Sequence, residues 1–522
     1  MMKLTQILQR TAHQYPNRPG ITFEGVTRTW KEVLRRCEQL AGGLRELDLN
    51  AGDRMAIISH NSSVMAELFY GPLWLGVVPV PLNWRWALPE LVACLEDCEP
   101  TVMVVDATHV DKARELQGRC PSIKTLIYIG DGEVPEGFVS YEAIVGGAER
   151  ISYCPFGGED LAAIVYTGGT TGRSKGVMLS HTNLYVNAMN HLEFDSVGEG
   201  HSIVLSGPMF HISALCRVYI HTFMDVHMVI LPQFDALDLM ENIQKYKVTS
   251  VILISAMAAL LLDHPRYSEF DLSTIRKINY GAAPMPPSLI NRLRKAFPRV
   301  SFFHGYGATE AAGIISTLSV KDHYLEGAAA KRLGSVGKPA PYIALRVVDD
   351  QDREVEPGVV GEIVIRGPNV MQGYYKMPEE TARVLRDDWY HTGDVGYRDE
   401  EDYIFLVDRM KDMIISGGEN IYSIEVERAI DLHPAIRQCA VVGRPDETWG
   451  EVVHAVISLE PGQSVTEAEL VAHCRQHIAG YKCPKSLSIW DALPLSGAGK
   501  LQKNEIRDRL EAETVSVQAT PV

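Results

Sequence analysis

Apolar and polar residues upstream of Gly334 follow two patterns, one typical of helices and one typical of strands. Residues 30–47 place apolar side chains on one helical face, and 64–75 predict another helix with Pro72 as a kink or stop. Short, continuous apolar runs indicate strands that are buried on both faces. Because these strands alternate with helices, we expect an α/β fold with layers around largely parallel sheets. The expected strands are 54–59, 101–105, 125–129, 161–165, 202–205, 228–231, 250–254 and 277–280.

The pattern changes after Gly334, where acidic turns separate shorter strands that predict antiparallel sheets. We expect a large N-terminal domain, residues 1–408, of layered sheets flanked by helices plus a β-barrel-like part. A hinge at 409–411 joins it to a small mobile α+β C-terminal domain, residues 412–522, of about 100 residues. The expected strands are 344–349, 361–366, 436–443 and 452–459, with a hairpin at 394–407 and helices at 424–431, 470–478 and 503–509.

Composition and charge narrow the class of protein. The chain has 522 residues and a formal net charge of −16, which argues against generic binding to nucleic acid or to an anionic membrane surface. Its nine cysteines include no Cys-x-x-Cys pair, which argues against a zinc ribbon, and their odd number fits a reducing compartment. The uncharged stretch 68–84 is interrupted by prolines and is shorter than the ~20 residues of a membrane span. We interpret the protein as cytoplasmic, with no membrane span and with a homodimer left open.

The strongest chemical signal is the sequence YTGGTTGRSKG at 166–176, which follows the apolar strand expected at 161–165. Glycines let the backbone curl, threonine hydroxyls donate to anionic oxygens and lysine adds a positive charge, so the segment predicts a polyphosphate cradle. It is not a Walker A loop, because Ser174 rather than glycine precedes Lys175 and Gly176 follows it. On this segment alone, an ordinary turn rich in glycine and threonine remains the alternative.

This loop resembles the phosphate loop of the adenylate-forming superfamily, which includes acyl- and aryl-CoA synthetases, luciferases and peptide-synthetase adenylation domains. The resemblance covers nearly the whole chain. It departs from the family pattern at Gly168, where many members have serine, and at Ser174, where many have proline. Further motifs occur in the family's order: PMFH at 208–211, YGAAP at 280–284, YGATE at 306–310, YHTGD at 390–394, DRMKD at 408–412, SGGEN at 416–420 and SGAGK at 496–500.

The resemblance implies how ATP is bound. Thr309 would touch the α-phosphate, and Glu310 would ligate Mg²⁺ together with Thr170 and phosphate oxygens. The Asp394 carboxylate accepts from both ribose hydroxyls, and Arg409 completes that contact. The remaining expected ATP-binding residues lie on the phosphate loop or beside the adenine: Thr167, Gly168, Gly169, Thr171, Gly172, Lys175, Gly281, Ala282, Ala283, Gly305, Tyr306 and Gly307.

The resemblance also implies a two-step reaction with ATP, Mg²⁺ and CoA. Lys500 is expected to bridge the substrate carboxylate and the α-phosphate during adenylation, and Lys411 is the expected pivot of the C-terminal domain. With Thr309 and Glu310, these are the expected catalytic residues. Gly417 and Gly418 would line the tunnel for the thiol arm of CoA.

The substrate acid is the main open question. Its pocket is expected to include Phe210, His211, Ser255, Gly281 and His304. Small residues at 281–283 leave room for an extended chain or a ring. We expect an ATP-dependent acid–CoA ligase that favours a medium- or long-chain fatty acid, with an aryl or arylpropenoic acid as the alternative.

Three other functions are weighed against the ligase. A stand-alone amino-acid adenylating enzyme would usually carry aspartate after Phe210, where this chain has His211. A luciferase-like oxygenase shares the adenylation motifs. A non-enzymatic binding protein predicts loss of Glu310, Asp394 or Lys500, and all three are present. A separate pair, His473 and His477, has the i, i+4 spacing of zinc ligands but no apparent third ligand, so we interpret it as solvent-facing.

Overall fold

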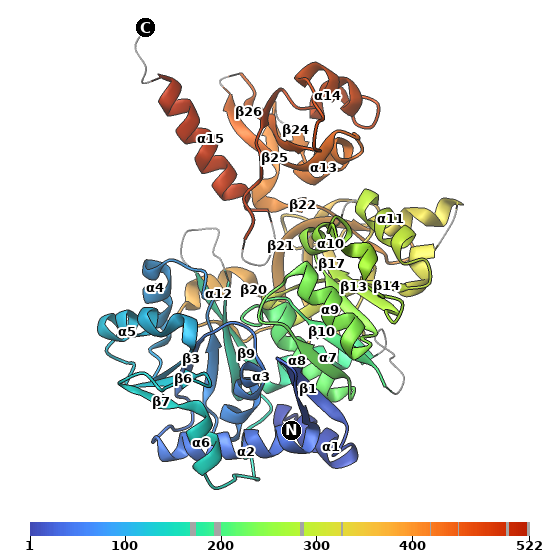
Figure 1. Cartoon of the computed structure of the whole chain (residues 1–522). Helices are drawn as coiled ribbons and strands as arrows, with labels where there is room; N and C mark the ends of the chain where they lie inside the picture. Colours follow the sequence, from blue (N-terminus) through green and yellow to red (C-terminus); the bar gives the residue numbers. More distant parts are fainter. Residues whose placement is uncertain are drawn as a thin grey trace.

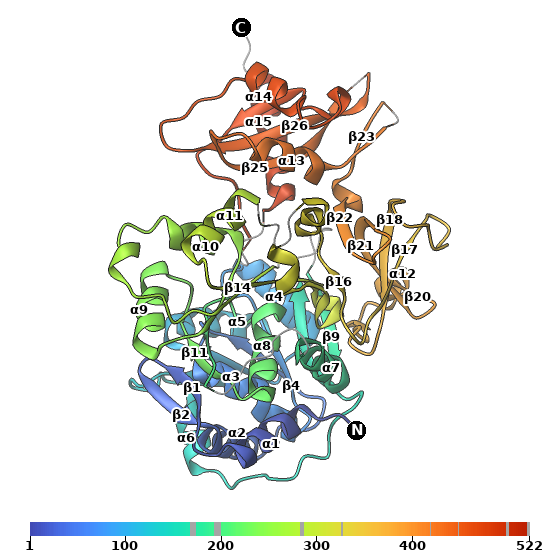
Figure 2. The same cartoon turned by 90° about the vertical axis from the view of Figure 1, so that its right-hand side faces the viewer.

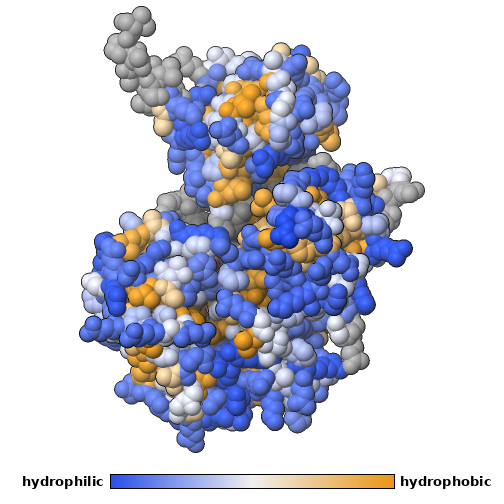
Figure 3. All heavy atoms as spheres, viewed as in Figure 1, coloured by the Kyte–Doolittle hydropathy of each residue, from blue (hydrophilic) through white to orange (hydrophobic). Residues whose placement is uncertain are grey.

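The computed structural model describes a large lower part and a smaller C-terminal part above it (Figures 1 and 2). It describes residues 1–167, 174–192, 200–281, 285, 287–324, 327–417, 419–446, 448–496 and 501–518. Hydrophilic residues cover most of the face in Figure 3, and hydrophobic residues gather in small areas of both parts. Within the described ranges, no helix is long and apolar enough to span a bilayer.

The first sheet is parallel throughout and has the strand order β4-β3-β5-β6-β7. Its strands are β3 (Arg54–Ile58), β4 (Val78–Pro81), β5 (Val102–Asp106), β6 (Thr125–Ile129) and β7 (Phe138–Ser140). Helix α2 (Trp30–Glu46) begins with a capping box, in which the Thr29 N–H donates to Glu32 Oε2 at 2.8 Å. The other helices of this region are α3 (Ser63–Tyr70), α4 (Leu88–Cys98), α5 (Val110–Arg119) and α6 (Tyr141–Gly147).

The second sheet has nine strands, and its central strands are parallel. The parallel strands are β1 (Pro19–Phe23), β10 (Ser202–Leu205), β11 (His227–Ile230), β12 (Ser250–Leu253), β13 (Lys277–Gly281) and β14 (Ser301–Ala308). Antiparallel partners lie at the two edges: β2 (Val26–Thr29), β15 (Gly313–Leu318) and β16 (Lys338–Pro339). The helices around it are α1 (Leu4–Gln14), α7 (His181–Leu192), α8 (Ile212–Phe223), α9 (Ala236–Tyr246), α10 (Ser255–Leu262) and α11 (Pro287–Ala296).

Two antiparallel sheets complete the large part. The hairpin of β8 (Leu161–Thr167) and β9 (Lys175–Ser180) pairs with β19 (Gly373–Tyr374), and it brings Thr167 opposite Lys175. The region that was expected to be β-barrel-like contains a five-stranded sheet, and helix α12 lies between its strands β18 and β20 in the sequence. Its elements are β17 (Ala344–Val348), β18 (Gly361–Arg366), β20 (Leu385–Arg386), β21 (Trp389–Arg398) and β22 (Ile404–Arg409), with α12 at Pro378–Val384.

The C-terminal part packs helices on a sheet of its own, and it has its own hydrophobic core from Ile414 to Cys483. By contrast, the largest core of the lower part runs from Leu4 to Ile404. The C-terminal elements are β23 (Ile414–Ser416), β24 (Glu419–Ile421), α13 (Ser423–Asp431), β25 (Ile436–Asp446), β26 (Gly450–Leu459), α14 (Glu467–Cys474), β27 (Ser486–Ile489) and α15 (Lys503–Gln518).

The expected α/β fold class is confirmed, and the ends of three helices differ from expectation. The helix expected at 503–509 continues to Gln518 as α15. The helix expected at 64–75 ends at Tyr70, and a 3₁₀ turn with Pro72 in its first turn covers Gly71–Trp74, because proline lacks the amide hydrogen that α-helix continuation needs. The helix expected at 470–478 begins earlier, at a capping box of Thr466 and Glu469, and ends at Cys474. The division of the chain at 409–411 stays a prediction.

Candidate functional site

The sheet topology brings several expected site residues to one edge of the second sheet. Strands β10, β12, β13 and β14 are neighbours and parallel, so their carboxyl ends lie at the same edge. Phe210 and His211 follow β10, Ser255 follows β12, Gly281 ends β13 and Gly305 lies beside it on β14. The carboxyl edge of parallel strands is the usual place for a ligand site in open α/β sheets.

Asp394 is the centre of a buried polar cluster. Asp394 is 5% exposed, the Tyr306 hydroxyl donates to its Oδ2, and Arg409 Nε lies 2.6 Å from its Oδ1. Strands β21 and β22 place Asp394 directly opposite Arg409. Burial and the neighbouring Asp394 charge raise the pKa of Tyr306 well above its usual value, so the hydroxyl keeps its proton and remains a donor. A carboxylate held in this way presents acceptor oxygens in a fixed position.

A second chain of contacts runs from Glu310 to the end of the phosphate loop. Glu310 lies in a 3₁₀ turn after β14, and the Tyr374 hydroxyl donates to its Oε1 at 2.9 Å. The Lys175 ammonium lies 5.0 Å from the centre of the Tyr374 ring and 2.7 Å from Glu380 Oε2 on α12. Hydrogen bonding to Lys175 lowers the pKa of Glu380. The lysine expected to bind phosphate is therefore paired with a carboxylate in this structure.

His304 is a neutral imidazole beside an aromatic side chain. Burial, followed by the nearby His323, lowers the pKa of His304 to about 3. Its ring centre lies 4.8 Å from that of Tyr280, whose hydroxyl is 2.8 Å from His323 Nε2. These side chains give this end of the sheet an uncharged, partly aromatic character.

The glycines of the site have different structural roles. Gly281 has a φ of +151°, and a Cβ there would lie 2.1 Å from the Gly305 carbonyl oxygen. A Cβ on Gly307 would lie 1.8 Å from the Gly313 oxygen. Gly281 and Gly307 are therefore glycine because backbones approach closely. At Gly305, by contrast, the nearest atom to an added Cβ is Ile314 Cδ1 at 3.5 Å, an ordinary contact.

The loop before His211 is tied to the first sheet. Asn61 donates to the Gly207 oxygen at 2.9 Å and to the Leu231 oxygen at 3.0 Å, and it accepts from Met209 N–H at 2.8 Å. His211 is the N-cap of α8, where its Nδ1 accepts from the Ser213 N–H at 3.3 Å. The position of Phe210 and His211 thus depends on the hydrogen bonds of Asn61, which lies just before α3.

The expected hinge lies among contacts that join the two parts. Asp408 lies in β22, where it is opposite Val395 of β21. Its carboxylate accepts hydrogen bonds from the Ser423 N–H and, at 3.0 Å, from the Ser423 hydroxyl. Lys503 Nζ lies 2.5 Å from Ser423 Oγ. Lys411 lies in the 3₁₀ turn Met410–Asp412 that follows. At Gly417, where φ is +59°, a Cβ would lie 2.7 Å from the Trp449 ring.

Several expected residues lie outside the described part of the chain. They are Gly168, Gly169, Thr170, Thr171, Gly172, Ala282, Ala283, Gly418 and Lys500. The roles expected for all site residues stay predictions. Two residues that the sequence analysis did not select, Tyr374 and Glu380, contact expected site residues. The sequence carries no signal for either contact, because the partners are 64 and 205 positions apart.

Comparison with known proteins agrees with this geometry. The sequence matches the AMP-binding enzyme family over residues 8–375 and the AMP-binding enzyme C-terminal domain over 425–500. It is 37% identical to a feruloyl-CoA synthase of an Amycolatopsis species, covering 96% of this chain and 97% of that protein. An indoleacetate–CoA ligase of Aromatoleum aromaticum is 33% identical, and the match covers 99% of this chain and 100% of that protein. A long-chain-fatty-acid–CoA ligase of Mycobacterium tuberculosis is 32% identical, with 93% and 94% covered.

A solved structure is similar over the same length. O-succinylbenzoate–CoA synthetase of Bacillus subtilis, in complex with ATP and a magnesium ion, has a TM-score of 0.83 and 29% identity. The match covers 96% of this chain and 99% of that one.

Proposed function

The chain belongs to the AMP-binding enzyme family and is an AMP-forming acid–CoA ligase that uses ATP and CoA; from this premise we propose that its acid is an aryl acid. The observation that carries the proposal is the full-length similarity to the feruloyl-CoA synthase and the indoleacetate–CoA ligase. The tilted pair of Tyr280 and His304, with ring centres 4.8 Å apart, supports it, because aromatic rings pack well against such a pair.

The reaction needs the enzyme to bring two anions together. A carboxylate attacks the α-phosphate of ATP, the bond to pyrophosphate breaks, and an acyl-adenylate forms. The thiol of CoA then attacks the acyl carbon, and AMP leaves. Hydrogen-bond donors and positive charges must stabilise the charge that develops on the phosphate oxygens.

The described residues fit these requirements. Asp394, with Tyr306 and Arg409 around it, has the acceptor oxygens that would bind ribose hydroxyls. Lys175 would bind phosphate once it leaves Glu380. Glu310 offers the carboxylate oxygen that a hard cation such as Mg²⁺ prefers, and the Tyr374 hydroxyl orients it. Such a cation would neutralise phosphate charge.

The fatty-acid preference expected from the sequence stays a prediction and is the second candidate. The 32% identity to a long-chain-fatty-acid–CoA ligase supports it. The deciding experiment measures kcat/KM for pyrophosphate release, with and without CoA, for ferulate, indole-3-acetate, decanoate and palmitate. We expect the aryl acids to exceed both fatty acids by at least tenfold. Higher kcat/KM for either fatty acid would favour the second candidate, and no turnover of any acid would contradict both.

A further inference from the structure

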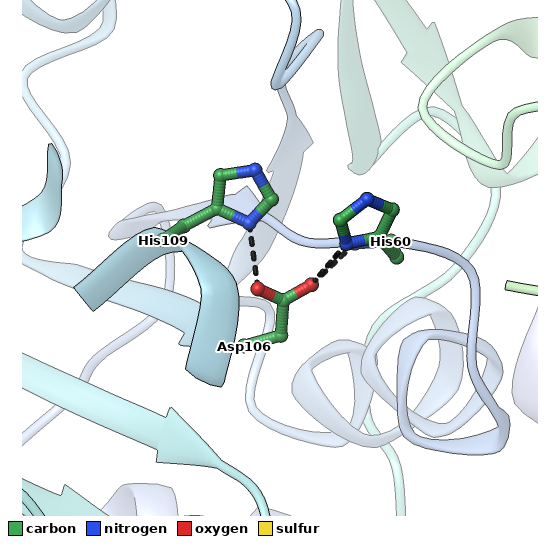
Figure 4. Close-up of side chains that lie close together, drawn as sticks. All are labelled: His60, Asp106 and His109. Atoms are coloured by element: carbon green, nitrogen blue, oxygen red, sulfur yellow. Dashed lines mark hydrogen bonds and ion pairs between the residues drawn. The ribbon is translucent and has the colours of Figure 1, made fainter. Parts of the chain in front are cut away.

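Three metal-ligating side chains meet at the carboxyl edge of the first sheet, and none of them is among the residues expected to bind ATP or the acid. His60 follows β3, Asp106 is the last residue of β5, and His109 lies in the 3₁₀ turn Ala107–His109. Figure 4 shows both imidazole rings directed at the same carboxylate. His60 Nδ1 lies 2.8 Å from Asp106 Oδ2, and His109 Nδ1 lies 2.6 Å from Oδ1. One ligand atom from each residue falls within 4.8 Å of the others.

We propose that His60, Asp106 and His109 bind a first-row transition metal ion of the Zn²⁺ type. Two imidazole nitrogens and one carboxylate oxygen are a common ligand set for such ions, and three protein ligands leave a tetrahedral position for water. To bind the ion through Nδ1, each imidazole would exchange its hydrogen bond to Asp106 for a bond to the ion and would carry its proton on Nε2.

The carboxylate is already oriented by the backbone. The His60 N–H donates to Asp106 Oδ2 at 2.7 Å, and the Thr108 N–H donates to Oδ1 at 3.0 Å. These donors would remain when an ion replaces the two imidazole contacts, and such outer contacts hold a ligand in place. With Zn–N and Zn–O distances near ~2.1 Å, tetrahedral ligand atoms are ~3.4 Å apart. Each imidazole, now 2.6–2.8 Å from a carboxylate oxygen, would therefore move away from that oxygen, and ligand atoms as far apart as 4.8 Å would move closer together.

The surroundings also fit an ion that enters from solvent. The His60 and Asp106 side chains are 23% and 16% exposed, whereas His109 is 6% exposed. The Trp84 ring packs beside both imidazoles, with ring centres 4.4 Å from His60 and 5.6 Å from His109. The site is therefore open on one side and walled by an aromatic ring on another. An ion here would join the ends of β3 and β5.

The test uses the full chain without an affinity tag, treated with chelator, and titrated with Co²⁺ in the absence of ATP. We expect visible absorption bands of tetrahedral Co²⁺ that Zn²⁺ abolishes by competition, and partial quenching of tryptophan fluorescence through Trp84. His60→Ala and His109→Ala should each weaken Co²⁺ binding by at least ~100-fold, because losing a ligand costs more than losing an outer contact. His109→Gln keeps a donor toward Asp106, so it separates lost binding from lost folding.

The chain provides a matched control in the C-terminal part. There the ring of His473 lies 5.0 Å from that of His433 and 4.8 Å from that of His477, so these histidines form a second cluster. The double variant His473→Ala/His477→Ala should keep the Co²⁺ bands. The proposal is overturned if this double variant loses the bands while His109→Gln keeps them. It is equally overturned if folded wild-type protein shows no bands at millimolar Co²⁺. The three side chains would then form a hydrogen-bonded network that binds no metal ion.

Discussion

Asp394 is a buried carboxylate with a donor on each side, so its removal has a defined consequence. Asp394→Ala should raise the KM for ATP by about 10- to 100-fold, since hydrogen bonds to a charged group contribute about 1.5–3 kcal/mol. It should also narrow the preference for ATP over 2′-deoxy-ATP. Tyr306→Phe is the matched control, because it removes a donor to Asp394 and keeps the carboxylate. Steady-state kinetics with both nucleotides provides the measurement, and unchanged discrimination in Asp394→Ala would contradict a role in ribose binding.

Lys175 pairs with Glu380, so a phosphate group of ATP would compete with the Glu380 carboxylate for the Lys175 ammonium group. Lys175→Ala should raise the KM for ATP without loss of the folded state. Glu380→Gln should lower that KM by a few-fold only, since partly exposed ion pairs contribute about 0–1 kcal/mol. Arg383, which also contacts Glu380, gives a control: Arg383→Ala should leave the KM for ATP nearly unchanged. Pyrophosphate release at sub-saturating ATP tests all three, and wild-type behaviour of Lys175→Ala would reject the phosphate-binding role.

Local motifs identify some residues of the site, but contacts between distant segments could not be predicted from the sequence. The motifs YGATE around Glu310 and YHTGD around Asp394 are local, so the sequence alone selects both residues. The partners Tyr374 and Glu380 depend on pairing between β9 and β19 and on the position of α12. No local pattern encodes that pairing. The cluster of His60, Asp106 and His109 was also missed, although Asp106 and His109 at i, i+3 after a strand are a local hint.

At the scale of elements, the carboxyl end of β14 lies so close to β13 and β15 that only some glycines can be replaced. Gly305→Ala should fold normally, because the new methyl group meets only ordinary contacts. Since Gly305 lies opposite Gly281 of the expected acid pocket, this variant should reduce kcat/KM for the bulkier acids more than for small ones. Gly307→Ala should destabilise the fold by more than ~1 kcal/mol, since its Cβ would overlap a carbonyl oxygen. Thermal unfolding and an acid panel distinguish the two. Equal loss for small and bulky acids in Gly305→Ala would place the acid elsewhere.

Strands β3, β5, β6, β10, β11, β12 and β13 could be predicted because buried strands are continuous apolar runs bounded by turns. The parallel strands β4, β7 and β14 were not predicted. The hairpin of β1 and β2 and helix α1 were not selected. Strand β2 shows why: its side chains are exposed or half-buried, so no apolar run marks it. The order of strands within a sheet depends on contacts between distant segments, such as β1 with β11, and could not be predicted from local patterns.

For the whole molecule, the proposed rotation of the C-terminal part separates the two half-reactions. Lys500→Ala should reduce acyl-adenylate formation by ~10²–10³-fold, the usual effect of removing a charge-stabilising donor, yet still convert supplied acyl-AMP and CoA to thioester. Lys411→Pro should form acyl-AMP and then stall, because proline fixes φ and restricts the preceding residue. Single-turnover assays of each half-reaction test this. Equal loss of both halves in both variants would contradict the rotation.

The separate cores described for the two parts have a calorimetric consequence. Because apolar side chains from Leu4 to Ile404 share one core, the sheets of the lower part should melt in a single cooperative transition. The C-terminal core, Ile414 to Cys483, shares no residue with it and should give its own heat-absorption peak. Differential scanning calorimetry should therefore resolve two endotherms, and Asp408→Ala, which removes hydrogen bonds to Ser423, should move them further apart in temperature. A single peak that shifts in temperature as a whole would show that the two parts unfold together, because the interface between them couples their unfolding.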